Sequence, residues 1–340
     1  MGNHITIKDI AKALGISTST VSRALSDAWD VKKETREQVL AMARKLNYHP
    51  NLNAKNLQNK RTGTVGIIIP EFVSSFFPKV IMGIQEELYA ADYHIFITQS
   101  DESRAKELAN MNLLREHMVE GIIISTTNEG GNEEAYRELI ASGLPVVFFN
   151  RCPKTVAAPK VLIDDCRMAE MAVEHLINTG RTDIRHLLGP VNLEVSAMRA
   201  QGFVNALGKH GMESEGKMIP AGIFVQDGEV AVARMLAEGS KLPDALFCFN
   251  DPVAIGAMRA LKAAGLRVPE DIAIVGFSEG SMATVVEPPL TTVLQPMQEM
   301  GRQAARLLLE QLTGNRRQSD RTVCLEATLN IRASSVSEKE

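Results

Sequence analysis

From residue 64 onward, short apolar runs alternate with amphipathic segments, and this alternation limits the possible folds more than any other feature. Strand-like runs occupy residues 65–70, 94–98, 121–125, 146–150, 160–163, 186–188, 218–223, 245–249 and 272–277, and helical spacing fills most of the intervals between them. Short apolar strands separated by amphipathic helices indicate parallel sheets that are covered on both faces. With roughly ten strands, we expect two doubly wound parallel-sheet α/β subdomains rather than one sheet.

The end of the chain adds a strand-like run at 291–294, a helix at 298–312 and a further strand-like run at 322–329. Their order predicts that the chain crosses between the subdomains more than once. We expect subdomain 1 to comprise residues 63–160 and 295–321, and subdomain 2 to comprise residues 161–294 and 322–340.

The first sixty residues predict helices without strands. Thr6 can cap a first helix, and Gly15 can end it because glycine tolerates a left-handed backbone. Ser17 can then cap a second helix over 18–25, and a third is expected over 32–46. Two helices joined by a turn with glycine are the helix-turn-helix layout, whose second helix enters the DNA major groove.

The start of this second helix is suited to reading DNA, because its residues are small and polar. Thr18, Ser19, Thr20 and Ser22 lie there, and Arg23 one turn further along can reach a guanine edge. Residues 1–62 hold eleven Lys or Arg against five Asp or Glu, whereas the remainder has ten more acidic than basic residues. A basic head on an acidic body predicts a polyanion partner for the head. The alternatives are a solvated charged face and a three-helix unit that serves only packing.

Several classes of protein are disfavoured by what the sequence lacks. No apolar run approaches the ~20 residues of a membrane span, and no secretory signal begins the chain. The four cysteines are too far apart for a zinc cluster, and no two histidines have the spacing of metal ligands. No Gly-x-Ser-x-Gly, P-loop or His-Glu-x-x-His motif occurs. We therefore predict an intracellular protein that is not an enzyme, with no metal, no cofactor and no membrane partner.

Motifs along nearly the whole chain stand in the order typical of one family. They are IKDIA at 7–11, GISTSTVSRAL at 15–25, ETR at 34–36, YHPN at 48–51, HL at 175–176 with Gly180, RAQGF at 199–203, FCFND at 247–251, VPEDI at 268–272 and LTTV at 290–293. In these motifs the chain resembles the LacI/GalR family of bacterial transcription regulators. The resemblance implies a bacterial, nucleoid-associated cytoplasmic protein.

The resemblance also assigns roles in the DNA-binding region. It implies a helix-turn-helix domain over 1–50, in which Thr18, Ser19 and Arg23 read bases. It further implies a hinge helix within the linker 51–62, with Leu57 wedged into the minor groove. Without the family context, Leu57 would be an ordinary apolar linker residue. Lys55 stands where the family usually has arginine and lacks its flat fork. The predicted DNA-binding residues are Thr6, Ser17, Thr18, Ser19, Thr20, Ser22, Arg23, Asn51, Ala54, Lys55 and Leu57.

The remaining residues, 63–340, resemble the family's effector-binding and dimerisation core, which is similar to periplasmic sugar-binding proteins. Ligands of open α/β sheets lie at the carboxyl ends of strands. Phe77 and Phe224 could instead be core aromatics, and Asp251 could simply cap the helix expected from Pro252. The predicted effector-binding residues are Phe76, Phe77, Asp101, Asn150, Arg151, Arg199, Phe224, Asn250, Asp251, Ser278 and Gln295.

Two departures from the family pattern bear on the ligand. Asn150 and Ser278 stand where the family commonly has carboxylates, while Arg151 and Arg199 remain. This loss of negative charge favours an anionic effector, such as a sugar acid or a sugar phosphate.

Together these features predict a sequence-specific transcription regulator, most simply a repressor. Two heads related by a dyad would read a palindromic operator, so we expect a homodimer. A small carbohydrate-like effector would control operator binding. A transport-type solute-binding protein is disfavoured, because it would have a signal peptide and no basic helical head.

Overall fold

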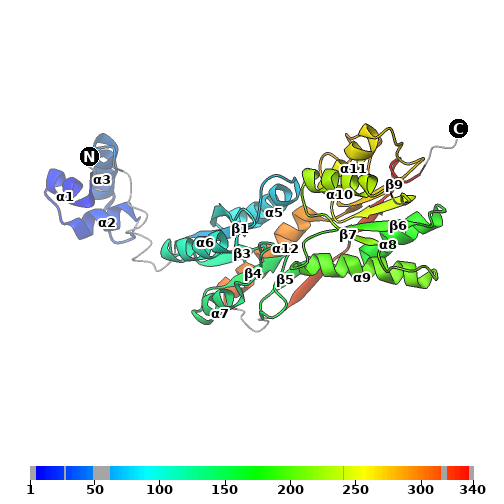
Figure 1. The fold of residues 1–340 in the computed structure, drawn as a ribbon. Helices are drawn as coiled ribbons and strands as arrows, with labels where there is room; N and C mark the ends of the chain where they lie inside the picture. Colours follow the sequence, from blue (N-terminus) through cyan, green and yellow to red (C-terminus); the bar gives the residue numbers. More distant parts are fainter. Residues whose placement is uncertain (1–4, 27, 49–61, 240, 315–319, 337–340) are drawn as a thin grey trace. The chain divides into compact units, whose positions relative to one another are not determined.

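The computed structural model describes residues 5–26, 28–48, 62–239, 241–314 and 320–336 (Figure 1). The chain divides into two compact units, residues 1–62 and 63–340, which we call the head and the core. The described elements of the head are α1 (Ile7–Leu14), α2 (Thr18–Leu25) and α3 (Lys33–Lys45). Those of the core are β1 (Thr64–Ile69), α5 (Phe76–Ala90), β2 (His94–Gln99), α6 (Arg104–Glu116), β3 (Gly121–Ile124), α7 (Glu133–Ala141), β4 (Val146–Phe149), β5 (Lys160–Ile163), α8 (Asp165–Asn178), β6 (Ile184–Leu188), α9 (Glu194–Lys209), β7 (Met218–Pro220), α10 (Val225–Ala237), β8 (Ala245–Cys248), α11 (Asp251–Ala263), β9 (Ala273–Ser278), β10 (Thr291–Leu294), α12 (Met297–Leu312), β11 (Thr322–Leu325) and β12 (Thr328–Asn330).

The head is a three-helix unit around a small apolar core. Ile10, Val21 and Val39, one from each helix, are fully buried against one another. Gly15 ends α1 with a φ of +68°, a left-handed conformation that glycine adopts without steric cost. The turn then leads to Ser17 and α2 within two residues. This confirms the predicted helix-turn-helix layout.

The core consists of two lobes, each built on a six-stranded sheet. The first lobe has the strand order β11-β5-β4-β3-β1-β2, and the second has the order β12-β10-β9-β8-β6-β7. Every pairing is parallel except that of β10 with β12. Two doubly wound sheets in the core and a helix-turn-helix unit in the head are the fold class expected from the sequence.

Helices cover both faces of each sheet, because alternate strand residues point to opposite sides. In the first lobe, Ile67 and Val147 face α5 and α12, whereas Ile68 and Phe148 face α6 and α7. In the second lobe, α8 and α9 cover one face, and α10 and α11 cover the other (Figure 1). Helices α5 and α12 cross in close contact at Gly83 and Gly301. A Cβ added at either glycine would lie only 1.9 Å (Gly83) or 2.0 Å (Gly301) from a backbone carbonyl oxygen of the facing helix, so both positions require glycine.

The predicted boundary between the subdomains needs correction at two places. Strand β5 ends at residue 163 and β11 spans 322–325, and the two pair in parallel at the edge of the first sheet. Residues 161–163 and 322–325 therefore belong to the first lobe, not to subdomain 2. The run at 322–329, expected as one strand, is divided at Glu326 and Ala327 into β11 and β12, which join different sheets.

Candidate nucleic-acid interface and ligand cavity

The start of α2 presents a cluster of small hydroxyl side chains. Ser17 caps the helix, because its Oγ accepts a hydrogen bond from the backbone N–H of Thr20 at 3.1 Å. The same Oγ lies 2.8 Å from the hydroxyl oxygens of Ser19 and Thr20. Thr18 and Ser19 are exposed, and Thr20 and Ser22 are half-buried. The exposed pair can therefore reach base edges, whereas Ser17 mainly fixes the helix start.

Two other predicted DNA-binding residues make contacts within the head. Thr6 caps α1, and both its N–H and its hydroxyl donate to Asp9 Oδ2 at 2.8 Å. Arg23 is exposed and forms an ion pair with Asp30, which follows α2. The predicted hinge residues Asn51, Ala54, Lys55 and Leu57 lie outside the described residues.

A cavity of about 700 Å³ lies between the two lobes of the core. The segments that follow β1, β4, β8 and β9 line it, as expected for ligands at the carboxyl ends of parallel strands. Nine of the eleven predicted effector residues are in its wall. They are Phe76, Phe77, Asn150, Arg151, Arg199, Phe224, Asn250, Asp251 and Ser278.

Arg199 is held on the second lobe by a carboxylate and by aromatic rings. Its Nε donates to Asp165 Oδ1 at 2.8 Å, and its Nη1 donates to the carbonyl oxygen of Phe249 at 2.6 Å. The guanidinium carbon lies 3.7 Å from the ring centre of Phe277. Burial raises the pKa of Asp165 and lowers that of Arg199, while their mutual attraction acts in the opposite sense. A buried guanidinium requires such a partner.

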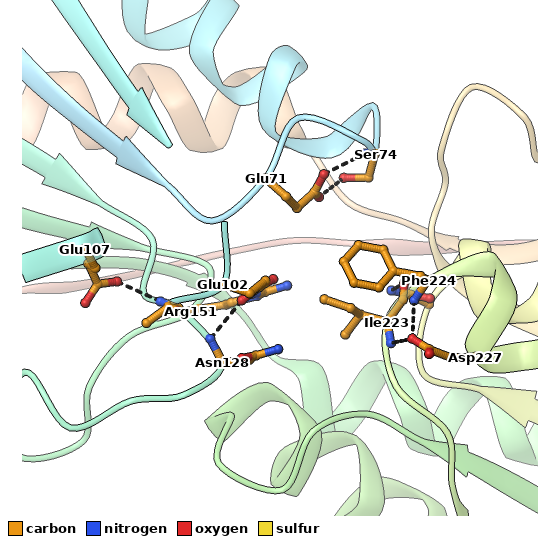
Figure 2. A network of polar contacts seen from close by, with 11 residues as sticks. Glu71, Ser74, Glu102, Glu107, Asn128, Arg151, Ile223, Phe224 and Asp227 are labelled. Carbon is orange, nitrogen blue, oxygen red and sulfur yellow. Dashed lines mark hydrogen bonds and ion pairs between the residues drawn. The ribbon is translucent and has the colours of Figure 1, made fainter. Parts of the chain in front are cut away.

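Arg151 is held on the first lobe by Glu102 (Figure 2). Its Nη1 donates to both carboxylate oxygens of Glu102, at 2.7 and 3.0 Å. Glu102 also accepts a hydrogen bond from the backbone N–H of Asn128 at 2.8 Å. Its neighbour Glu107 accepts from the backbone N–H of Thr127 at 2.7 Å. Two carboxylates thus fix the loop after β3 and place the Arg151 guanidinium at the cavity wall.

Asp251 is a buried carboxylate without a cation at hydrogen-bond distance. Its Oδ1 accepts from the hydroxyl of Thr292 at 2.5 Å, and its Oδ2 accepts from the N–H of Gly280 at 2.6 Å. Burial raises the pKa of Asp251 to about 7. The alternative in which Asp251 caps α11 is wrong, because Asn250 does so: its Oδ1 accepts from the N–H of Val253 at 2.9 Å.

Two predicted effector residues are not in the cavity wall. Asp101 is exposed and pairs with Lys106 and Gln99. Its φ of +50° and that of Glu102, +57°, turn the chain so that the second carboxylate points inward instead. Gln295 is buried behind the wall, and its Nε2 donates to the Ser278 hydroxyl at 2.9 Å. Gln295 therefore positions a wall residue.

Sequence reasoning missed part of the wall. Glu71 follows β1 and accepts from the backbone N–H of Ser74 at 2.8 Å (Figure 2 shows both residues), and Phe249 directly follows β8. The rule that was applied to Phe77 and Asn250 would have found both. Arg259 lies two turns inside α11 and pairs with Glu229 at 3.1 Å. No sequence signal marks it.

An anionic ligand was expected because two carboxylates of the family pattern are missing while Arg151 and Arg199 remain. In the structure each of these arginines has a carboxylate partner, so neither is an unpaired cation, and the charge of the ligand stays a prediction. The ionisable wall residues are three carboxyl groups and three guanidiniums: Glu71, Glu229, Asp251, Arg151, Arg199 and Arg259. The third guanidinium, that of Arg259, pairs with Glu229.

Among the described residues, no group of three or more His, Cys, Asp or Glu side chains could hold a metal ion. No helix among those residues is long and apolar enough to span a bilayer.

Comparison with known proteins agrees with the helix-turn-helix head and with the two-lobed core. Residues 6–51 match the family described as bacterial regulatory proteins, lacI family, and residues 173–335 match a periplasmic binding protein-like domain. Catabolite control protein A of Priestia megaterium is 34% identical over 306 residues, which cover 90% of this chain and 92% of that protein.

Two solved structures are similar over almost the full length. One is a complex of the transcriptional regulator CelR with cellobiose, with 29% identity, a TM-score of 0.74 and coverage of 97% of this chain and 99% of that one. The other is a lac repressor dimer bound to operator and the anti-inducer ONPF, with 25% identity, a TM-score of 0.86 and coverage of 98% and 100%. This chain therefore belongs to the LacI family and is a DNA-binding transcriptional regulator.

Proposed function

We propose that the protein is a repressor that binds a palindromic operator as a homodimer, and that a small uncharged polyhydroxyl ligand in the core controls its affinity for the operator. The observation that carries this proposal is the cavity of about 700 Å³ between the lobes, in whose wall every guanidinium is paired with a carboxylate. This volume is in the range of sites for small organic ligands.

The wall offers what a sugar ring requires. Phe76, Phe77, Phe224 and Phe249 provide apolar faces, and Asn150 and Ser278 provide amide and hydroxyl groups. Aromatic faces with a few converging polar groups suit a ring that is apolar on one side and bears hydroxyls at its edge. The cellobiose in the CelR complex belongs to this chemical class.

An uncharged ligand is favoured because each of the three wall arginines is already paired with a carboxylate, Arg151 with Glu102, Arg199 with Asp165 and Arg259 with Glu229. An anion at Arg199 would compete with Asp165 at 2.8 Å, and an anion at Arg151 would compete with Glu102 at 2.7 Å. A ligand hydroxyl can accept from a guanidinium N–H that the carboxylate partner leaves unused, and unlike an anion it brings no second negative charge beside Asp165 or Glu102.

The exposed edge of the first lobe supports the homodimer. Strand β2 is an edge strand, and its Phe96 and Ile97 are 48% and 41% exposed. Met82 and Tyr89 on α5 are also exposed. An edge strand with exposed apolar side chains invites pairing with another surface. Phe96→Glu is expected to produce monomers in sedimentation experiments while circular dichroism stays unchanged.

The ligand acts by changing how the lobes approach each other. The two lobes already contact each other at the cavity wall, where the N–H of Ser281 donates to the Ser75 hydroxyl at 2.9 Å. A second contact between the lobes is the ion pair of Lys154 and Glu194 at 2.6 Å. A ligand that bridges both walls would favour one arrangement, and such coupling is typically worth roughly 1–3 kcal/mol, or 5- to 150-fold in affinity.

The test begins with selection of bound fragments from sheared genomic DNA by the purified full chain. We expect one enriched palindrome. Affinity for that palindrome is then measured with a panel of neutral mono- and disaccharides and with the matching sugar acids and sugar phosphates. At least one neutral sugar should change the affinity fivefold or more. Binding of only the acids or phosphates would overturn the assignment of an uncharged ligand, and enrichment without a palindrome would overturn the dimer.

A further inference from the structure

A second cavity, of about 270 Å³, lies between the two lobes; we call it the small cavity, and the ligand cavity described above the large one. The first lobe lines it with the loop after β3, the start of α7 and the segment after β4, and the second lobe lines it with residues 191–197. Glu194 and Ala197 of α9 are in its wall, whereas Val195 and Arg199 of the same helix are in the wall of the large cavity. The start of α9 therefore serves both cavities, and the function proposed above uses only one of them.

The small cavity has a buried hydroxyl group without a partner. Thr127 is in its wall and is 1% exposed, and its Oγ1 has no hydrogen-bond partner among the described residues. The backbone at this position is fixed, because the N–H of Thr127 donates to Glu107 Oε2 at 2.7 Å. Buried hydroxyl groups are costly to leave unpaired, and they normally bond to protein, water or a ligand. Thr127 thus indicates that a polar molecule belongs in this cavity.

The wall around Thr127 is held in place by the same carboxylate. Glu107 is fully buried and accepts hydrogen bonds from the Tyr136 hydroxyl and, at 2.8 Å, from Asn132 Nδ2. Tyr136 is also in the cavity wall, and its ring packs edge-on against Phe148 with the ring centres 5.1 Å apart. Because these side chains are ordered before a ligand arrives, binding costs them little conformational entropy.

The charged groups of the wall favour an uncharged occupant. Arg151 pairs with Glu102, and Lys154 pairs with Glu194 at 2.6 Å. Glu133, in the first turn of α7, is the remaining charged residue of the wall. Its carboxylate opposes an anion, and the guanidinium and ammonium groups oppose a cation. The other polar side chains of the wall are neutral: Thr126, Thr127, Thr155 and Asn192.

We propose that the small cavity is a second ligand site, which takes one small uncharged molecule with several hydroxyl groups, such as a polyol or a single sugar ring. Its volume lies just below the range of sites for drug-sized ligands, so one small molecule fills it. A hydroxyl group both donates and accepts, so the ligand can bond to Thr127 and to Glu133 or Asn192 without breaking an ion pair. The site does not rest on the function proposed for the large cavity.

The first test asks which class of molecule binds. The full chain is titrated with erythritol, ribose and glucose, and with glycerate and ethanolamine as the anionic and cationic comparisons. Saturation-transfer NMR follows the binding, because it detects weak ligands. We expect at least one of the three uncharged probes to bind. Binding of none of them, or only of glycerate or ethanolamine, would overturn the proposal.

Variants in the two cavities then show where the probe binds. Ala197→Tyr fills the small cavity from an exposed position on α9, and Gln201→Tyr, four residues further along and also exposed, is the matched control. Phe224→Ala removes an aromatic face from the large cavity. We expect Ala197→Tyr to abolish probe binding and the other two variants to retain it.

The opposite pattern, with binding kept by Ala197→Tyr and lost in Phe224→Ala, would place the probe in the large cavity. That result would overturn the second site and leave the function proposed for the large cavity intact. Probe binding in the small cavity while no sugar changes operator affinity would contradict only the function proposed for the large cavity.

A second pair of variants tests the hydroxyl group itself. Thr127→Val has nearly the same shape but lacks the hydroxyl, and it should weaken probe binding roughly tenfold, as expected for one lost hydrogen bond. Thr127→Ser keeps the hydroxyl and should bind the probe nearly as well as wild type. Circular dichroism checks that both variants are folded. Equal probe affinity of Thr127→Val and wild type would show that Thr127 does not contact the probe, and would overturn the proposal.

Discussion

Two of the three arginines in the cavity wall, Arg199 and Arg151, are anchored in different ways. Arg199 and its partner Asp165 both belong to helices, α9 and α8, and their side chains are 4% and 7% exposed. Arg151 and its partner Glu102 both lie in segments that follow strands, and their side chains are 8% and 11% exposed. Arg199 also has the Phe249 carbonyl and two aromatic rings around it.

This difference separates a structural anchor from an adjustable one. Helices α8 and α9 are packed so closely that a Cβ on Gly202 would lie 2.2 Å from the carbonyl oxygen of Cys166. Asp165 and Arg199 therefore cannot separate without disturbing the second lobe. The loop that carries Glu102 is held by single hydrogen bonds rather than by close helix packing: the N–H of Glu102 donates to the carbonyl oxygen of Pro70, and its carboxylate accepts from the N–H of Asn128 and from Arg151. We infer that ligand-dependent movement is easier on the Arg151 side.

Removal of Arg199 should have the largest effect on stability. Arg199→Ala leaves the Asp165 carboxylate buried without its cation, and breaking a buried ion pair in this way costs about 3–5 kcal/mol. Urea unfolding of the variant and of wild type at neutral pH measures this difference. A matched control is Arg199→Met combined with Asp165→Leu, which removes both charges and should recover most of the loss. A single variant within 1 kcal/mol of wild type would show that the pair is not an anchor.

Asp251, unlike Asp165 and Glu102, is a buried carboxyl group whose hydrogen-bond donors, the Thr292 hydroxyl and the Gly280 N–H, are uncharged. Because its pKa is about 7 in the folded chain and 3.8 ordinarily, the native state binds more protons than the unfolded state between these values. Its contribution to stability is therefore present at low pH and is lost as the pH rises toward 7, by about 2 kcal/mol between pH 5 and pH 7.

The measurement is the free energy of unfolding against pH for wild type and Asp251→Asn. The asparagine loses one of the two hydrogen bonds, so it lowers stability at every pH, but it does not titrate. The difference between the two proteins should shrink as the pH rises. Parallel curves would show that Asp251 is ionised throughout this range.

Arg151→Ala should cost less than Arg199→Ala, about 1.5 kcal/mol, the lower end of the range for a hydrogen bond to a charged group. Glu102 keeps its bond to the Asn128 N–H and can turn toward water. Arg151→Ala should change the response of operator affinity to the ligand more than Arg199→Ala does, because Arg151 lies on the more adjustable side of the cavity. Unfolding experiments and operator affinity with and without the active sugar measure the two effects. An equal loss of stability in both arginine variants would remove the distinction between the anchors.

Sequence reasoning predicted the fold well where the hydrophobic period was unbroken. Runs such as 65–70 and 245–249 are buried strands, because a parallel sheet covered on both faces leaves its central strands no polar side. It failed at 322–329, where an apolar run serves two sheets. The division at Glu326 and Ala327 depends on which distant edge each half pairs with, and no local pattern records that.

For the cavity, position after a strand was a sufficient guide at Asn150 and Asn250, and it failed at Asp101. Which of two consecutive carboxylates points inward depends on backbone dihedrals, and both Asp101 and Glu102 have positive φ values. The same limitation hid the partners of the arginines. Asp165 precedes Arg199 by 34 residues and Glu102 precedes Arg151 by 49, so only the tertiary fold brings them together.

The smallest predicted effect tests the backbone difference between the two anchors. Glu102 has a φ of +57°, which a side chain disfavours by roughly 1–2 kcal/mol, whereas Asp165 is the first residue of a helix. Glu102→Gly should therefore be about 1 kcal/mol more stable than Glu102→Ala. At position 165 the order should reverse, with Asp165→Ala more stable than Asp165→Gly by roughly 0.5 kcal/mol. Each comparison is between two variants that lack the carboxylate, so loss of the ion pair cancels. The free energy of unfolding of all four variants is measured in urea. If the alanine variant were the more stable one at position 102 as well as at position 165, the positive φ of Glu102 would impose no steric cost on a side chain.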